Sequence, residues 1–397
     1  MHEFVYHVPT KVVFGCGACN QVGDVVREYS FKRCLVVTGQ GSAIKSGLID
    51  RITAQLAEKG VKYAVFSGAQ PNPLLSHARA GVAKALELKA DLILAVGGGS
   101  TIDTAKAIAH GTANPETDLW QFWLGKEPLT KTMPVGAVLT IPAAGSETSD
   151  SAVLTDGDAG VKRGLNTDFN RPVFAVLDPE LTLTLPPYQV ACGVTDILMH
   201  TLDRYFNPYV DNDTTDAIAE ALLRVVLAEG DVVREHPGDL HAMSELMWAG
   251  SLSHNNLTGL GGKKDFAVHQ LGHALSAKYN VTHGASLSAV WKSWASYVAP
   301  VDGYARFARF ARNVWGVTEE DDKAAALKGI ALQSDYFHKL GMPVNLQELG
   351  VGEVDDAACQ ALAELCSYGR SRTIGTFQVL NADDILAIYR SASSREN

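Results

Sequence analysis

Short apolar runs in the first half of the chain constrain its fold most strongly. The clearest is Asp91–Val96, with the sequence DLILAV, which stops at three consecutive glycines. Runs that are apolar at successive positions are typical of parallel strands covered by helices on both faces. The other runs of this kind are Cys34–Val37, Tyr63–Phe66, Pro134–Thr140 and Val173–Leu177. Helix-period segments such as 76–88 and 101–110 lie between them, and this alternation predicts an α/β domain.

The pattern changes after Leu185, where Pro186 and Pro187 stop regular structure. Strand-like runs then disappear, and long helix-period segments follow, such as 216–228 and 243–252. A chain of 397 residues is also longer than one core usually serves. We therefore expect an α/β domain over residues 1–185 and an all-helical domain over residues 186–397.

Composition and charge argue against several classes of protein. The net charge is −10 and no stretch is dense in Lys or Arg, so we expect no nucleic-acid partner. No apolar run is long enough to span a bilayer, and the N-terminus lacks the pattern of a signal peptide. Six scattered cysteines indicate reduced thiols, and we interpret the Cys16/Cys19 pair as two unrelated thiols. These features predict a cytoplasmic protein with no membrane partner.

Two loops after predicted strands are candidates for nucleotide binding. Gly97–Lys106 follows a buried strand and opens a helix, whose N-terminal N–H groups and dipole suit a phosphate. A plain tight turn capped by Ser100 or Thr101 explains the same residues, because the spacing matches neither standard phosphate motif. Thr140–Glu147 follows another strand and would lie at the same edge of the sheet. Taken alone, that stretch is more often just a loop.

Three of the twelve histidines, His269, His273 and His283, lie close together in the sequence. His269 and His273 are four residues apart, as are Asp196 and His200, so each pair shares a helix face. Two such helices can close a metal site in a helical core, and Asp with several His suits Fe²⁺ or Zn²⁺. Chance pairs on capped or solvated helix faces are the alternative. Spacing alone would select His269 and His273 together as metal ligands.

In combination, these motifs resemble the iron-containing alcohol dehydrogenase family, especially its NADPH-dependent aldehyde reductase and butanol dehydrogenase branch. The resemblance covers nearly the whole chain. It implies an N-terminal Rossmann-like dinucleotide-binding domain and an all-α metal-binding domain, the dehydroquinate synthase-like fold. The segments that carry it are Phe14–Ala18, Pro71–Pro73, Gly97–Lys106, Thr140–Glu147, Leu177–Glu180, Leu185–Pro187, Asp196 with His200, and His269 with His273 and His283.

The resemblance also changes the choice of metal ligands. By position, the ligands of one Fe²⁺ or Zn²⁺ would be Asp196, His200, His269 and His283. His273 would instead lie near the nicotinamide, where it is a candidate proton relay. Many relatives have Glu at the position of Asp203, and the role of this Asp is left open.

The resemblance also implies which residues bind the nucleotide. Pyrophosphate would be held by Gly97, Gly98, Gly99 and Ser100. Other residues that match nucleotide-lining positions of relatives are Asn72, Asp103, Thr140 and Lys162.

The loop after Thr38 departs from NAD-preferring relatives, which have an Asp there for the ribose 2′-OH. Here Gly39, Gly41 and Ser42 offer N–H and hydroxyl donors, Lys45 offers a positive charge, and no carboxylate repels a 2′-phosphate. We therefore expect NADP as the cofactor, with NAD as the alternative.

The resemblance implies a metal-dependent oxidoreductase that interconverts primary alcohols and aldehydes by hydride transfer. It also implies a homodimer or a larger homo-oligomer. Alternatives are a glycerol dehydrogenase or another polyol or keto-substrate oxidoreductase of the superfamily, and a non-enzymatic nucleotide-binding protein. The complete Asp/His set disfavours metal-free maleylacetate reductases. The lack of a dense basic cluster disfavours dehydroquinate synthase.

Overall fold

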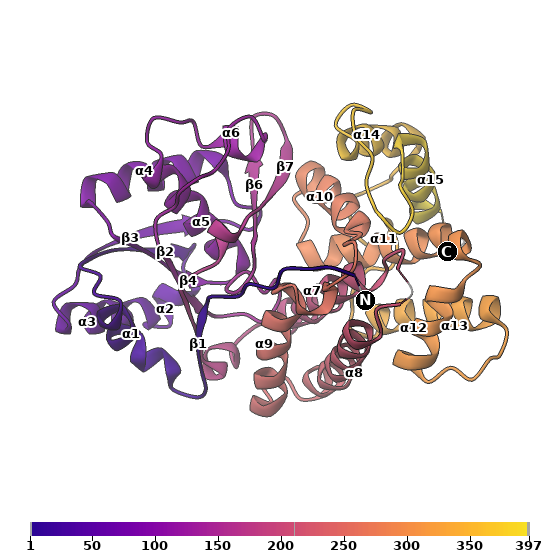
Figure 1. The fold of residues 1–397 in the computed structure, drawn as a ribbon, viewed down its shortest axis with the longest axis horizontal. Helices are drawn as coiled ribbons and strands as arrows, with labels where there is room; N and C mark the ends of the chain where they lie inside the picture. The colour runs from indigo at the N-terminus through magenta and orange to yellow at the C-terminus, as the bar shows by residue number, and fades with distance from the viewer. Residues whose placement is uncertain (1, 210, 395–397) are drawn as a thin grey trace. The chain divides into compact units, whose positions relative to one another are not determined.

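The computed structural model describes residues 2–209 and 211–394, and the chain divides into two compact units. Residues 7–185 form an α/β unit, and residues 186–394 form a helical unit together with residues 2–6 (Figure 1). Within the helical unit, the His2 ring stacks on Tyr209 at a centroid distance of 3.8 Å, and His2 Nε2 lies 2.8 Å from Asp211 Oδ1. Residues 2–6 therefore group with the helical unit, whereas the sequence predicts an α/β domain over residues 1–185.

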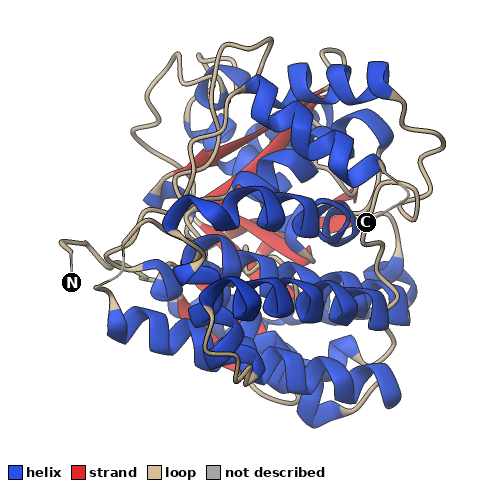
Figure 2. Cartoon of the chain, turned by 90° about the vertical axis from the view of Figure 1, so that its right-hand side faces the viewer, coloured by secondary structure: helices blue, strands red, loops and turns tan. Residues whose placement is uncertain are grey.

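A parallel sheet forms the centre of the α/β unit, with the strand order β1-β8-β5-β4-β2-β3. Figure 2 shows strands in red among the blue helices. Its strands are β1 (Lys11–Phe14), β2 (Arg33–Gly39), β3 (Lys62–Ala69), β4 (Leu92–Gly97), β5 (Val135–Leu139) and β8 (Phe174–Leu177). All five predicted runs are strands of this sheet. Every residue of the central β4 is buried, which explains its continuous apolar sequence, whereas the edge strand β3 is half exposed.

Helices cover both faces of this sheet. On one face, alternate residues of the central strands pack against α1 (Val22–Glu28) and α3 (Leu48–Glu58). The longer helices α4 (Leu75–Leu88) and α5 (Gly99–Ala113) also contact the sheet. They pack in a second cluster with α6 (Trp120–Trp123) and the hairpin strand β6.

The structure contains two features beyond those predicted from the sequence: β1 and an antiparallel hairpin of β6 (Ser151–Asp156) and β7 (Val161–Asn166). His110 at the end of α5 supports this hairpin indirectly. Its Nδ1 lies 2.7 Å from Thr132 Oγ1, and its Nε2 lies 2.7 Å from Asn170 Oδ1. Asn170 in turn donates to the backbone oxygens of Asp150 and Leu165 beside the hairpin.

The described residues of the second unit form helices and no strand element, as predicted. These helices are α7 (Pro187–Tyr205), α8 (Asp213–Glu235), α9 (Leu240–His254), α10 (Ala267–Tyr279), α11 (His283–Val298), α12 (Ala305–Trp315), α13 (Asp322–Lys339), α14 (Asp356–Cys366) and α15 (Ala382–Ser393). Their core includes the fully buried Trp291 and Trp294. Among the described residues, no helix has the length and hydropathy needed to cross a bilayer.

A buried ion pair between Arg306 and Asp216 helps to join α12 to α8. Arg306 binds both carboxylate oxygens of Asp216 and the backbone oxygen of Tyr205, and its guanidinium lies over the Tyr205 ring. Removing one partner of such a pair leaves a buried charge uncompensated. This pair lies within the helical framework, so its loss would affect the packing of α8 and α12.

Candidate functional site

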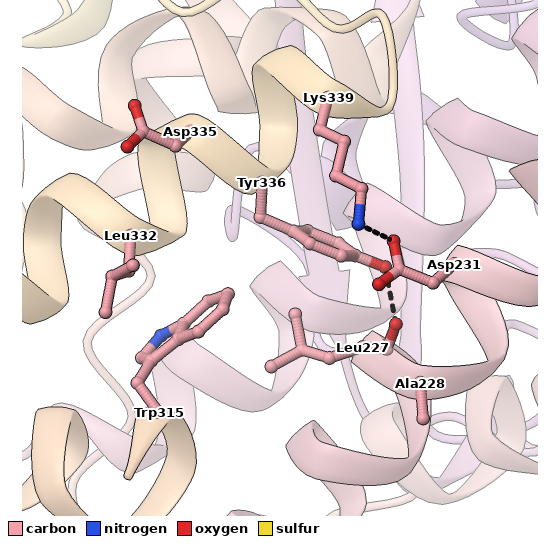
Figure 3. Close-up of a pocket in the computed structure, with 8 residues that line it drawn as sticks. All are labelled: Leu227, Ala228, Asp231, Trp315, Leu332, Asp335, Tyr336 and Lys339. Atoms are coloured by element: carbon pink, nitrogen blue, oxygen red, sulfur yellow. Dashed lines mark hydrogen bonds and ion pairs between the residues drawn. The ribbon is translucent and has the colours of Figure 1, made fainter. Parts of the chain in front are cut away.

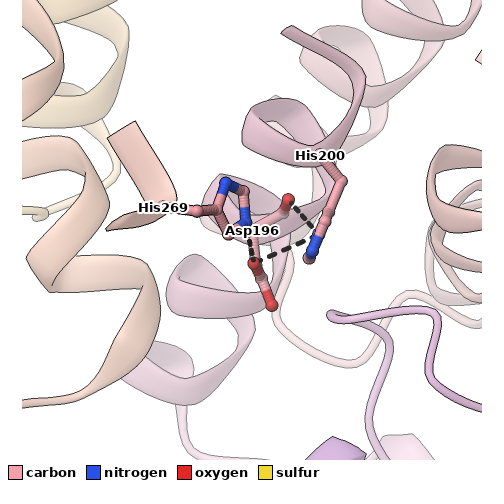
Figure 4. A group of neighbouring side chains, drawn as sticks. All are labelled: Asp196, His200 and His269. Atoms are coloured by element: carbon pink, nitrogen blue, oxygen red, sulfur yellow. Dashed lines mark hydrogen bonds and ion pairs between the residues drawn. The ribbon is translucent and has the colours of Figure 1, made fainter. Parts of the chain in front are cut away.

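Three histidine rings converge on one carboxylate oxygen in the helical unit. Asp196 and His200 lie one turn apart on α7, His269 lies on α10, and His283 is the first residue of α11. Asp196 Oδ1 is 3.2 Å from His200 Nδ1, 3.8 Å from His269 Nε2 and 3.7 Å from His283 Nε2. Figure 4 shows three of these side chains facing one another. The ligand atoms of Asp196, His200 and His269 lie within 4.8 Å of one another.

Hydrogen bonds orient two of the three rings. His200 Nδ1 lies 2.9 Å from the backbone oxygen of Asp196, to which it donates, so Nε2 keeps its lone pair. His269 Nδ1 lies 2.6 Å from Asp203 Oδ2, so its Nε2 is directed toward Asp196. Within the described chain, neither His269 Nε2 nor Asp196 Oδ1 has a hydrogen-bond partner. Buried lone pairs that face each other without a donor between them fit a divalent cation, which accepts electron pairs from both.

The electrostatics of His200 suit the same role. Burial lowers the pKa of His200 well below its usual value, and the neighbouring His269 and Arg204 lower it further. His200 is therefore neutral near pH 7, which is the form that binds a metal. Burial also disfavours the charged form of His269, but the Asp203 and Asp196 carboxylates outweigh it and raise the pKa of this ring.

His273 lies beside this group on the next turn of α10. Its ring centroid is 6.4 Å from that of His269 and 5.4 Å from that of His283. Spacing alone favours His269 and His273 as two ligands of one metal, but in the fold His269 and His283 are the pair that faces Asp196. His283, at the start of the next helix, directs its nitrogen to Asp196 instead.

Two contacts of this group were not predicted from the sequence: His254 beside His200, and Asp203 as the partner of His269. His254 is the last residue of α9, and its ring centroid lies 3.9 Å from that of His200. No charged or histidine partner at helical spacing marks His254, so the tertiary fold alone reveals it. Phe266 completes the enclosure, with its ring centroid 5.0 Å from that of His269.

In the α/β unit, the glycines after β4 allow two loops to pack together. A Cβ at Gly98 would lie 2.4 Å from Ile141 Cγ2, one at Gly99 would lie 3.0 Å from Ala144 Cβ, and one at Gly97 would meet Thr101. Thr140 N donates to Gly97 O over 3.1 Å, which joins the same two loops. A side chain at any of these three glycines would therefore collide with neighbouring residues of the same unit.

The N-terminus of α5 has no side-chain cap. Its N-cap is Gly98, so the capping role considered for Ser100 or Thr101 is wrong. Side-chain caps normally satisfy the first N–H groups of a helix, and an uncapped end offers them to an anion. Gly39 approaches the same end, because a Cβ built on it would lie 3.8 Å from Thr101 Oγ1. Gly41, with φ +151°, is the N-cap of the short helix α2 (Ser42–Lys45).

Asp103 is committed to contacts within the protein. Its Oδ1 accepts a 2.5 Å hydrogen bond from Ser146 Oγ, and its Oδ2 accepts the Val153 N–H over 2.9 Å. The fully buried Lys106 donates to Ser146 Oγ and to Ser151 O. Burial lowers the pKa of Lys106 to about 8, although the nearby Asp103 opposes this shift. Asp103 and Lys106 thus hold the 140–147 loop and the β6–β7 hairpin against α5.

Asn72 and Lys162, which are distant in sequence, meet in this unit. Asn72 lies before α4 in a left-handed conformation with φ +58°, and its Oδ1 accepts a 3.0 Å hydrogen bond from Lys162 Nζ on β7. The fold therefore pairs two of the residues predicted to line the nucleotide site.

Family models match both parts of the chain. The model described as iron-containing alcohol dehydrogenase matches residues 9–179, and the C-terminal model of the Fe-containing alcohol dehydrogenase family matches residues 190–393. The chain belongs to the iron-containing alcohol dehydrogenase family. The predicted family and fold are therefore confirmed, and the protein is an NAD(P)-dependent alcohol dehydrogenase or aldehyde reductase.

Several members of this alcohol dehydrogenase family are similar over their full length. NADH-dependent butanol dehydrogenase A of Clostridium acetobutylicum is 36% identical, over 99% of this chain and 100% of that protein. NADPH-dependent aldehyde reductase YqhD of Escherichia coli is 33% identical over the same shares. The crystal structure of NADH-dependent butanol dehydrogenase A from Thermotoga maritima has a TM-score of 0.95 at 31% identity, covering 99% of both chains.

A pocket elsewhere in the helical unit holds none of the predicted site residues. It lies among α8, the end of α12 and α13 (Figure 3). Its lining residues are Leu227, Ala228, Asp231, Trp315, Leu332, Asp335, Tyr336 and Lys339. Lys339 Nζ pairs with Asp231 over 2.7 Å, and Tyr336 Oη donates to Leu227 O, so much of its polar lining is engaged internally. These contacts stabilise the helix packing around the pocket.

Proposed function

We propose that this enzyme reduces aldehydes to primary alcohols, and catalyses the reverse reaction, with one divalent metal held by Asp196, His200, His269 and His283. The observation that carries the proposal is the convergence of His269 Nε2 and His283 Nε2 on Asp196 Oδ1, with the His200 ring beside the same carboxylate. Fe²⁺ and Zn²⁺ both suit this donor set. When bound, such an ion acts as a Lewis acid on the substrate oxygen.

The dinucleotide carries the hydride, and residues of the chain orient the metal ligands, transfer the proton and exclude water. Asp203 and the Asp196 carbonyl hold two imidazoles in the orientation described above. His273, which lies beside the ligand group but is not needed to complete it, is the candidate proton relay. Asp196 is buried among these histidine rings, which limits the access of water to its carboxylate.

We assign pyrophosphate binding to Gly97, Gly98, Gly99 and Ser100 at the uncapped start of α5. Asn72, Asp103, Thr140 and Lys162 are assigned to the walls of the nucleotide site. Asp103 would act through the loop that it holds, because both of its oxygens are already engaged.

NADP is the proposed cofactor, with NAD as the alternative. Relatives of similar identity are named for NADH and for NADPH, so the proposal rests on the loop after β2. Gly39, Gly41 and Ser42 supply no carboxylate to repel a 2′-phosphate, and Lys45 adds a positive charge.

We also propose a cytoplasmic homodimer or larger homo-oligomer. All six cysteines are free, as expected for thiols in a reducing compartment.

Initial rates with butyraldehyde and with butanol test the function, each measured with NADPH or NADP⁺ and with NADH or NAD⁺. The proposal expects turnover in both directions and a higher kcat/KM with the phosphorylated cofactor. Equal or better turnover with NADH would refute the cofactor preference. No turnover with either aldehyde or alcohol would refute the proposed substrate class.

A further inference from the structure

Asp203 contacts the start of α10 through both its side chain and its backbone. It lies three residues after His200 on α7 and is fully buried. Its Oδ2 is 2.6 Å from His269 Nδ1, and its backbone oxygen accepts the Asp265 N–H over 2.8 Å. Asp203 therefore links the helix that carries two of the proposed ligands to the helix that carries a third.

Two buried carboxylates compete for the single proton of the neutral His269 ring. Asp196 Oδ1 lies 3.8 Å from Nε2, and Asp203 Oδ2 lies 2.6 Å from Nδ1. An ionised carboxylate only accepts hydrogen bonds, so each of the two favours a proton on the nitrogen that faces it. The shorter contact is the stronger one, and it keeps the proton on Nδ1.

The alternative tautomer would obstruct the site. With the proton on Nε2, His269 would present a hydrogen atom to Asp196 Oδ1 instead of a lone pair. The same proton would then occupy a lone pair of the carboxylate oxygen that the other two histidines face. One misplaced proton would thus take two donor atoms from a cation at once.

We propose that Asp203 is a positioning residue that selects the metal-binding tautomer of His269 and thereby sets the metal affinity. This inference rests on the proposed metal site. Asp203 also places a second negative charge directly behind the ring, which complements the charge of a divalent cation together with Asp196.

Metal titration of the full-length protein tests this inference. The metal is first removed with a chelator, and Co²⁺ or Zn²⁺ is then titrated against a chromogenic competitor. Asp203→Asn keeps the size of the side chain but removes its charge and offers an N–H₂ group toward the ring. We expect its metal dissociation constant to rise about 10- to 100-fold, the range typical of such outer-shell partners.

Asp216→Asn is the matched control. Asp216 is also buried in the helical unit, where it pairs with Arg306 and touches none of the proposed ligands. This variant should lower the melting temperature but leave the metal dissociation constant within about twofold of the wild type, far from the 10- to 100-fold effect expected at Asp203. Equal weakening in both variants would show that loss of a buried carboxylate acts through general destabilisation, and would overturn the proposal.

A second measurement needs no variant of Asp203. In the metal-free wild type labelled with ¹⁵N-histidine, at a pH well above the raised pKa of the ring, long-range ¹H–¹⁵N correlations report which nitrogen of His269 carries the single proton. We expect Nδ1–H, and an Nε2–H tautomer would contradict the inference. If the wild type binds no stoichiometric metal, the proposed metal site itself fails. Normal binding by both wild type and Asp203→Asn refutes only the role of Asp203.

Discussion

His283 Nε2 lies 3.7 Å from Asp196 Oδ1, so the first residue of α11 faces a carboxylate in the middle of α7. His273, ten residues earlier, is a neighbour in space but has a different proposed role. We predict that His283→Ala weakens metal binding more than about 100-fold, because a ligand should matter more than its outer-shell support. His273→Ala should retain one metal per chain. Metal content after dialysis, measured by mass spectrometry, distinguishes the two variants, and equal retention would contradict the ligand assignment.

The same His273→Ala variant tests proton transfer. Its turnover should fall about 100-fold or more, with an altered pH profile of kcat, because general acid–base groups typically contribute that much. The matched comparison is His254→Ala, which removes a ring from the same enclosure without removing the relay. A wild-type pH profile in His273→Ala would exclude the relay.

Gly39 offers a test of cofactor choice with little steric risk. A Cβ at this position would meet only ordinary contacts, 3.7 Å from Ala69 O and 3.8 Å from Thr101 Oγ1. Gly39→Asp should lower kcat/KM for NADPH about 30-fold or more, because the new carboxylate would repel a 2′-phosphate at a cost of about 2 kcal/mol or more. Activity with NADH should be retained or improved. Parallel loss with both cofactors would indicate a distorted loop instead of a charge effect.

The burial of His110 should make the stability of the α/β unit sensitive to acid. Burial lowers its pKa to about 4, below the usual 6.5, so the unfolded chain binds the extra proton first. This contribution to stability is complete above about pH 6.5 and is lost as the pH falls toward 4, by about 3 kcal/mol. His110→Gln cannot titrate, so its urea midpoint should fall less between pH 7 and 4.5. An identical fall in both proteins would assign the acid sensitivity to other groups.

Gly375 should be intolerant of a side chain. Its φ is +80°, and a Cβ there would lie 2.6 Å from Gln378 O and 3.2 Å from Asp265 Oδ2. Asp265 accepts the N–H groups of Thr376, Phe377 and Ala267, and so ties this turn to the start of α10. Gly375→Ala should lower the free energy of unfolding by about 3 kcal/mol or more, through backbone strain plus the clash.

Gly350→Ala is the control for backbone strain alone. Its φ is +74°, but no atom lies within 4 Å of the added Cβ. The expected cost is only about 1–2 kcal/mol. Equal losses in the two alanine variants would show that the contact with Gln378 is not the cause.

Local sequence pattern predicted five of the six strands of the sheet, because most of them are buried, apolar and followed by glycine or polar turns. It missed β1, which has only four residues and lies at the sheet edge, and the hairpin, whose β7 is partly exposed. Spacing on a helix identifies a shared face but not the direction of a ring nitrogen. For that reason it paired His269 with His273, whereas the turn at Asn280, with φ +53°, leads into α11 and brings His283 to Asp196. His254 and the Asp203 contact depend on tertiary packing alone.

The most direct test of the account is metal-dependent turnover of a single preparation. Butyraldehyde reduction with NADPH is measured before chelation, after removal of the metal, and after addition of Fe²⁺ or Zn²⁺, with metal content determined at each stage. We expect activity to be lost when the metal is removed and to recover at one ion per chain, and we expect neither binding nor recovery in His283→Ala. Full activity in metal-free wild-type protein would contradict this expectation.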